Sequence, residues 1–274
     1  MSKTDNYVRH GRLWTTSGKD ILPIIPGVDF VGHVVRCGEK ATSDYGININ
    51  DRVAALIQTG GNCKYTVEHA NQLVHVPKAL KAEEAAVLVE IYLSAFQILL
   101  HGNKSEDRYG IRPLEGKEIL IIGGISNVSQ AMIELAVVFG AKHVYTTAVG
   151  KHYDFLQDLG ATVLDISIDN WLPIVNGQMD IVVDSFCDDH YESPWQALNS
   201  NGKLICHGMQ TIMNEEPSCV TSLEQLWART KSICMSRTYN YDVYSYWEKN
   251  LEESKVRIFF SSRLIYLIII YLSF

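Results

Sequence analysis

The sequence lacks the features that identify several classes of protein. It has no cluster of basic residues, and its 24 lysines and arginines against 31 aspartates and glutamates give a formal net charge of −7. An acidic chain of this kind is unsuited to nucleic acid. The six cysteines form no C-x-x-C pair, and the first 14 residues contain no apolar core. We therefore expect reduced thiols, no signal peptide and a cytoplasmic location.

The length of 274 residues and the 47% share of hydrophobic residues allow a sizeable core and two domains. Residues 1–80 are rich in strand-forming residues and punctuated by glycine, with strands expected at 30–37, 51–57 and 64–67 and no visible helical period. The pattern changes at Ala82, where an alanine-rich helix begins and links this part to a second domain, for which we expect residues 81–250.

The stretch from Gly116 to Lys151 has the pattern of a βαβ unit. Residues 119–122 are apolar throughout, as in a strand buried on both faces, and Gly123 and Gly124 close them. Apolar residues then recur at helical spacing up to Gly140, a helix C-terminal glycine. A second strand is expected at 144–147. The pattern is typical of the first half of a dinucleotide-binding domain.

The turn between strand and helix departs from the usual G-x-G-x-x-G fingerprint. Backbone N–H groups at such a helix start suit a pyrophosphate. In this chain, however, Ser126, Asn127 and Ser129 stand where glycines are expected. Ser129 is small enough to replace the last glycine, whereas bulk at Ser126 and Asn127 would push a cofactor away. Asn127 is also a good N-cap, so the alternative is an ordinary strand-to-helix turn.

The end of the second strand bears on the choice of cofactor. NAD-selective domains place an acid there for the ribose hydroxyls, but residues 145–151 contain none, and Lys151 can pair with a 2′-phosphate. Thr147, Ala148 and Tyr153 would flank the adenosine. A solvated surface lysine is the alternative interpretation. NADPH is the predicted cofactor.

Several blocks in register carry a family resemblance. They are Leu22-Pro23-x-x-Pro26-Gly27-Val28-Asp29-Phe30-Val31-Gly32, then Asp51-Arg52-Val53, Gly60-Gly61 with Tyr65, and Glu83-Glu84-Ala85-Ala86 leading to Tyr92-Leu93-Ser94-Ala95-Phe96. From about Asp5 to about Gly208 the chain resembles the medium-chain dehydrogenase/reductase superfamily, and within it the zinc-free quinone oxidoreductase and enoyl reductase branch.

The resemblance implies an α/β fold in which a GroES-like β-barrel is joined to a Rossmann domain with a doubly wound parallel sheet. Family members have further strands before the segment matched by residues 5–11, and their closing segment is not recognisable after about Leu251. We therefore expect an incomplete barrel in a chain truncated at both ends. Zinc is not expected, because Val28 stands at a ligand position and His33 has no partner at ligand spacing.

The resemblance also implies a reaction, in which NADPH transfers hydride to a quinone or an α,β-unsaturated carbonyl. Tyr7 matches a pocket tyrosine and is the candidate catalytic donor, with an ordinary interfacial tyrosine as the alternative. Family members often dimerise through the sheet edge, which makes a homodimer possible. The residues expected to bind the cofactor are Gly60, Gly61, Ser94, Gly123, Gly124, Ser126, Asn127, Val128, Thr147, Ala148, Lys151, Ser185 and Gly208.

Two alternatives to a reductase stay open. Phe186 and Cys187 stand where the family has valine and glycine, so a catalytically silent, nucleotide-binding or scaffold protein on the same fold is the second hypothesis. A Rossmann-type methyltransferase is the third, and the blocks before residue 80 argue against it. The hydrophobic tail, residues 256–274, has an apolar run too short to span a bilayer, so a non-native terminus is favoured over a membrane anchor.

Overall fold

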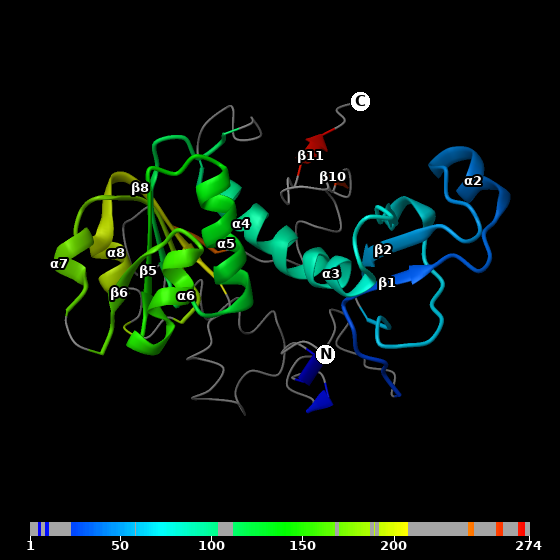
Figure 1. The fold of residues 1–274 in the computed structure, drawn as a ribbon, viewed down its shortest axis with the longest axis horizontal. Coiled ribbons are helices and arrows are strands. Elements are labelled where there is room, and N and C mark those ends of the chain that lie inside the picture. Colours follow the sequence, from blue (N-terminus) through cyan, green and yellow to red (C-terminus); the bar gives the residue numbers. More distant parts are fainter. Residues whose placement is uncertain are drawn as a thin grey trace. The chain divides into compact units, whose positions relative to one another are not determined.

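The computed structural model describes residues 5–6, 9–10, 23–57, 59–103, 112–167, 170–186, 189 and 192–207, together with the backbone of residues 241–243, 256–259 and 268–271. The chain divides into two compact units, the smaller comprising Met1–Glu90 and Tyr246–Phe274 and the larger Ile91–Ser245. Figure 1 shows the elements of both.

The larger unit is built on a parallel sheet of six strands in the order β6-β5-β4-β7-β8-β9. Numbered along the chain, this order is 3-2-1-4-5-6, that of a Rossmann domain, and it reverses between β4 and β7. The strands are β4 (Glu118–Ile122), β5 (His143–Ala148), β6 (Thr162–Asp165), β7 (Met179–Asp184), β8 (Leu198–Cys206) and β9 (Tyr241–Val243).

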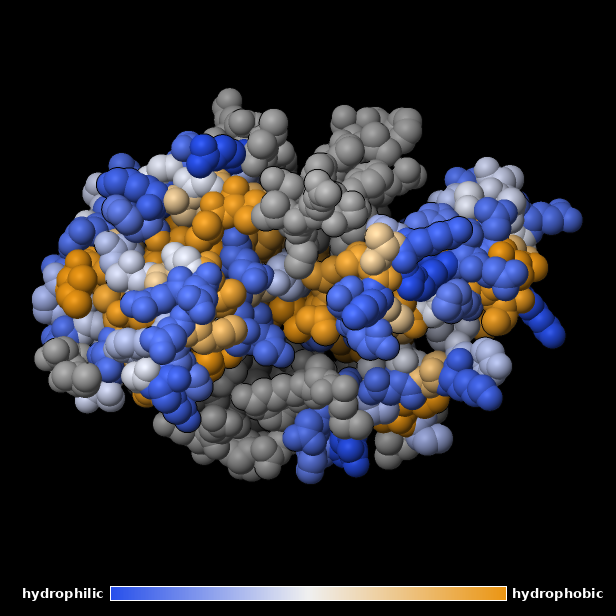
Figure 2. All heavy atoms as spheres, in the orientation of Figure 1, coloured by the Kyte–Doolittle hydropathy of each residue, from blue (hydrophilic) through white to orange (hydrophobic). Residues whose placement is uncertain are grey.

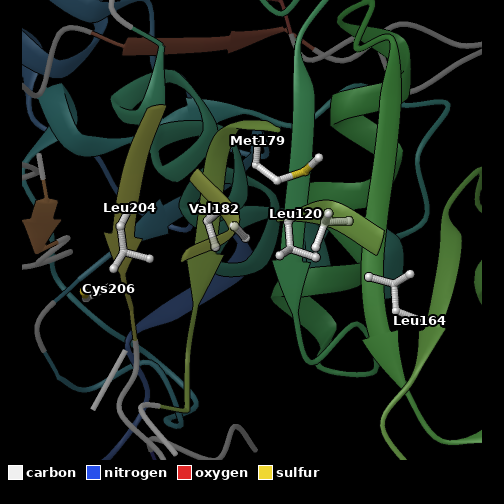
Figure 3. Packing of buried hydrophobic residues seen from close by; sticks show 8 residues of the cluster. Leu120, Leu164, Met179, Val182, Leu204 and Cys206 are labelled. Atoms are coloured by element: carbon white, nitrogen blue, oxygen red, sulfur yellow. The ribbon is translucent and has the colours of Figure 1, made fainter. Parts of the chain in front are cut away.

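Helices cover both faces of this sheet. On one face Leu120, Val182 and Leu204 belong to one buried cluster (Figure 3). Val175 and Ala197 join this cluster from two helices. On the other face the end of α4 lies so close to β7 that a Cβ on Gly102 would be 2.7 Å from Ile181 Cγ2. The helical segments are α4 (Leu93–Gly102), α5 (Asn127–Val138), η3 (Gly150–His152), α6 (Tyr153–Asp158), α7 (Leu172–Val175) and α8 (Glu192–Ala197).

The smaller unit contains an antiparallel sheet of three strands in the order β1-β2-β3. Its elements are β1 (Asp29–His33), α2 (Glu39–Tyr45), β2 (Arg52–Leu56), η1 (Ala70–Gln72), β3 (Val74–His75) and α3 (Ala82–Val87). With the parallel sheet of the other unit, this arrangement confirms the expected α/β fold class.

Two local expectations for the smaller unit are wrong. Helix α2 was not expected. It buries none of its residues, so its sequence shows no apolar residues at helical spacing. Residues 64–67 form no strand, and Val67 is 97% exposed, so the apolar pattern there does not reflect burial in a sheet.

A continuous helical segment crosses the division between the units. It consists of α3, a π-helical turn η2 (Leu88–Tyr92) and α4. The segment Ala82–Gly102 is long and apolar enough to cross a membrane by length and composition alone, but 56% of its most apolar window is buried inside the protein, as in a core helix. Figure 2 shows that hydrophobic residues also reach the surface elsewhere.

Part of the hydrophobic tail forms regular structure. Strands β10 (Val256–Phe259) and β11 (Ile268–Tyr271) pair antiparallel with each other in a separate two-stranded sheet. Residues so rich in isoleucine and aromatic side chains have a high β-propensity, which agrees with this pairing.

Carboxyl groups gather where β1 meets the helical segment of the smaller unit. Burial, followed by the charges of Asp29 and Asp5, raises the pKa of Glu90 to about 7. Burial also raises the pKa of Asp29, although the backbone N–H of Glu90 donates to its carboxylate. Because an acid whose pKa is raised on folding binds its proton more tightly in the folded state, ionisation of Glu90 destabilises this unit.

We predict that Glu90→Gln stabilises the protein at about pH 8 and has little effect near pH 4.5. The folded-state pKa of about 7 lies above the usual 4.5, so stability is lost as the pH rises between these values. The amide avoids that loss, which amounts to about 3 kcal/mol at most. Urea unfolding at several pH values measures it. Glu83→Gln, at an exposed position in the preceding helix α3, is the control, and an equal gain at every pH would contradict the assignment.

Candidate functional site

The predicted glycine loop joins β4 to α5 and is held by the end of β5. The backbone N–H of Gly123 donates to Thr147 Oγ1 at 2.8 Å, and that of Gly124 donates to the Thr147 carbonyl oxygen at 3.0 Å. Gly123 has a φ of +79°, which favours glycine. These two N–H groups are therefore occupied within the protein and do not face outward.

Gly124 is required by the close approach of the neighbouring strand. A Cβ at this position would lie 2.3 Å from Thr146 Oγ1 and 2.9 Å from its Cγ2. Thr146 is fully buried and its hydroxyl donates to the Ile121 carbonyl at 2.8 Å, so it has no room to withdraw. Gly124, the first position of the fingerprint that ends at Ser129, is thus retained for a steric reason.

Ser126, rather than Asn127, is the N-cap of α5, which corrects the capping expectation. Its Oγ accepts from the Ser129 backbone N–H at 3.1 Å and lies 2.7 Å from Ser129 Oγ. The bulk of Ser126 is used inside the cap, and Ser129 is buried beneath it. Exposed Asn127 is instead the first residue of the helix.

The first turn of α5 still offers donors. The first N–H groups of a helix have no acceptor within it, and Ser126 takes only that of Ser129. Within the described part of the chain no acceptor is recorded for the N–H groups of Asn127 and Val128. These two donors, with the positive end of the helix dipole, suit an anionic group.

The end of β5 carries the residues expected to select the cofactor. Thr147 and Ala148 are buried, and Lys151 is exposed in the turn η3 that follows directly. The next strand adds an acid that the sequence did not reveal, since Asp165 pairs with Ala148 across the sheet. Its Oδ2 would lie 3.8 Å from a Cβ on Gly150. Hydrogen bonds from Ser167 lower the pKa of Asp165, so this carboxyl is ionised at neutral pH.

The end of β7 lies beside the glycine loop. Ile122 pairs with Asp184, so Gly123 and Ser185 each lie one residue beyond this pair. The Ser185 side-chain oxygen is buried and has no hydrogen-bond partner among the residues that the structure describes. A buried hydroxyl without a partner costs free energy that a bound polar group would recover. Ser185 is thus the residue of this edge whose chemistry most clearly fits a ligand.

Phe186 approaches the glycine loop from the same edge. Its backbone N–H donates to Asp184 Oδ1 at 2.8 Å, which fixes a tight turn after the strand. A Cβ on Gly123 would lie 2.0 Å from Phe186 Cε2 and 2.8 Å from Cζ. The ring therefore fills the space that the missing side chain of Gly123 leaves.

The remaining predicted residues lie in the smaller unit, in α4 or outside the described residues. Gly60 and Gly61 lie in the smaller unit, where a Cβ on Gly61 would be 2.2 Å from the Asp29 carbonyl oxygen. Ser94 is buried in α4, which packs against α5, β7 and β8. The candidate catalytic Tyr7, together with Cys187 and Gly208, lies outside the described residues.

The described residues contain no group of three or more histidine, cysteine, aspartate or glutamate side chains that could hold a metal ion. Val28 is buried, and His33 is exposed at the end of β1. The groups that the candidate site offers are the backbone donors of α5 and the side chains of Ser185, Lys151 and Asp165.

Comparison with known proteins places this geometry in context. No protein-family model matches the chain. The chain is 34% identical to a chloroplastic quinone-oxidoreductase homolog of Spinacia oleracea over 149 residues, which are 53% of the chain and 43% of that protein. It is 30% identical over 175 residues to 2-methylene-furan-3-one reductase of Solanum lycopersicum, with 60% and 42% covered. The synaptic vesicle membrane protein VAT-1 homolog of Rattus norvegicus is 26% identical over 211 residues, with 75% and 50% covered.

The chain is thus similar to quinone oxidoreductase-like and enoyl reductase proteins of the medium-chain dehydrogenase/reductase superfamily. Its fold agrees with solved structures of that family. The quinone oxidoreductase from Coxiella burnetii matches with a TM-score of 0.69, 22% identity, and coverage of 95% of this chain and 78% of the other. CurK enoyl reductase matches with a TM-score of 0.65, 21% identity, and coverage of 90% and 67%. The chain spans about half the length of the first curated relatives it matches.

Sequence reasoning missed three residues of this site. Asp165 follows a strand whose position beside β5 is a property of the sheet order, and Thr146 lies on the face that meets Gly124. Phe186 was noted only as a departure from the family, and its contact with Gly123 joins residues far apart in the chain. Strand ends in a Rossmann sheet are the signal that would have found Asp165 and Phe186.

We predict that Gly124→Ala destabilises the larger unit by about 1–3 kcal/mol, because the new methyl group meets the fixed Thr146 side chain and overpacks the turn. Gly150→Ala is the matched control. There the nearest atom would be 3.8 Å away, an ordinary contact, and we expect a change within about 0.5 kcal/mol. Urea unfolding of both variants measures this, and equal midpoints would show that the loop adapts.

Proposed function

We propose that this protein is an oxidoreductase that binds NADPH and transfers hydride to a quinone or an α,β-unsaturated carbonyl without zinc. The observation that carries the proposal is the partnerless buried hydroxyl of Ser185 beside a glycine loop, at the point where the strand order reverses. Ligands of open α/β sheets bind outside the carboxyl ends of the strands at such a point. Relatives named as quinone-oxidoreductase homolog and furanone reductase support the reaction class.

Different residues of the larger unit would bind different parts of the cofactor. The N–H groups of Asn127 and Val128 would receive the pyrophosphate, and Ser185 would offer its hydroxyl to a polar group nearby. Lys151 would pair with a 2′-phosphate at the end of β5. The bound nicotinamide would supply the hydride, while the protein positions it and excludes water.

Asp165 favours a second version of the same function. A carboxylate near the end of β5 accepts hydrogen bonds from ribose hydroxyls and repels a 2′-phosphate, as in NAD-selective domains. Two of the hydrogen bonds to Asp165 Oδ1 already come from Ser167, at 2.7 and 2.5 Å. NADH is therefore the alternative cofactor, and the two assignments make opposite predictions for two single variants.

We predict that the full chain binds NADPH more tightly than NADH in calorimetric titrations. Lys151→Ala should weaken NADPH binding about tenfold, because a charge-assisted contact is lost, and should leave the affinity for NADH unchanged. Lys142→Ala is the matched control, because it removes the same charge at the opposite end of β5. If the chain instead binds NADH more tightly than NADPH, and Asp165→Asn weakens NADH binding, the cofactor is NADH.

The same titrations separate an enzyme from a silent relative. Cofactor binding followed by consumption of NADPH with a quinone or enone acceptor supports the reductase. Binding without consumption on any such acceptor supports the nucleotide-binding or scaffold alternative. A folded chain that binds neither dinucleotide would contradict the proposed function.

A further inference from the structure

The side chain of Phe186 lies where the proposed dinucleotide would pass. The crevice of a Rossmann sheet opens between the two strands at which the order reverses, here β4 and β7. Phe186 follows β7 by two residues, and its ring contacts Gly123, the residue that follows β4. The ring therefore joins the ends of these two strands.

The contact lies over the turn that leads to the proposed pyrophosphate site. Gly123 stands directly before the fingerprint that begins at Gly124, and its missing Cβ leaves space over the turn toward the start of the helix, where a pyrophosphate would bind. Here Cε2 of the ring would be 2.0 Å from that absent Cβ, so an aromatic carbon already occupies the approach. A ring and a ligand atom cannot share this space.

The backbone beneath the ring is held by hydrogen bonds, so the side chain is the part of this contact that is left to move. The N–H of Phe186 donates to Asp184 Oδ1, and the N–H groups of Gly123 and Gly124 donate to Thr147. Phe186 is only partly buried, so solvent lies on part of its side chain. Rotation of the side chain is thus the motion that would free the crevice.

We propose that Phe186 sets the dinucleotide affinity of this site by occupying the crevice over Gly123, and that it must turn aside for NADPH to bind. This inference rests on the proposed function. The apparent affinity of a site that is open for only a fraction of the time is reduced by that fraction. A shorter side chain removes the reduction and therefore tightens binding.

The proposal distinguishes two parts of the cofactor. The adenosine end with its 2′-phosphate would lie at the end of β5, beside Ala148 and Lys151, and does not require the crevice between β4 and β7. Phe186 should therefore oppose whole NADPH and leave adenosine 2′-monophosphate unaffected. A general loosening of the domain would change both ligands.

The experiment is calorimetric titration of the full chain with NADPH and, separately, with adenosine 2′-monophosphate. Phe186→Ala should bind NADPH about tenfold more tightly than the unaltered protein, with Phe186→Leu between the two. Both should bind the monophosphate as the unaltered protein does. Ile174→Ala, which removes an exposed apolar side chain from α7, is the control and should change neither affinity.

Each remaining outcome overturns the inference in a recognisable way. Unchanged or weaker NADPH binding in Phe186→Ala, with normal binding by the unaltered protein, would show that the ring is not an obstacle, and the proposed function would stand. If every folded variant binds neither ligand, the dinucleotide site itself is refuted. Equal tightening of both ligands would replace a local obstruction by a general effect.

Discussion

The attachment of the Gly123–Gly124 loop to Thr147 is the interaction on which the candidate site depends. One threonine accepts both loop N–H groups, through its hydroxyl and through its carbonyl oxygen. This fixes the direction in which the chain leaves β4 and hence the place where α5 begins. The direction of the free N–H groups in the first turn of α5 is set by this attachment, because these groups have no partner within the helix.

Close packing around the loop explains why these two glycines are present while later ones are absent. Gly124 has the Thr146 side chain against it, so no other residue fits there. At Ser129 the chain needs a small residue, and its hydroxyl is satisfied by Ser126. Serine thus replaces glycine at a position where the requirement is small size and not an unusual backbone conformation.

The sequence predicted the parts of the fold that bury continuous apolar runs. Strands β4 and β5 were expected within a few residues, and the apolar run in β4 is what a strand covered on both faces requires. Helix α2 buries no residue, so no periodicity marked it. Val67 led to a wrongly predicted strand, because this apolar residue is exposed and belongs to no sheet. Hydrophobic periodicity predicts elements that bury apolar residues, and it fails for an element that buries none.

The candidate site was predictable to the same extent, and for the same reason. Residues 123–128 and the end of β5 follow from the βαβ pattern, whereas the partners of these residues come from other strands. The N-cap belongs to Ser126 because its ψ of 149° places its Oγ over the helix start, which composition alone does not decide between two good capping residues. Asp165 and Phe186 reach the site through the sheet order, which sequence spacing does not express.

These contacts change the meaning of the altered fingerprint. Bulk at Ser126 was the feature expected to displace a cofactor, but that side chain is turned into the cap and hydrogen-bonded there. Asn127 is exposed at the first helical position. The obstruction that the structure does contain comes from β7, where an aromatic ring lies against Gly123. An intact glycine therefore does not by itself establish an open site, because the space that it leaves can be filled by a residue 63 positions later in the chain.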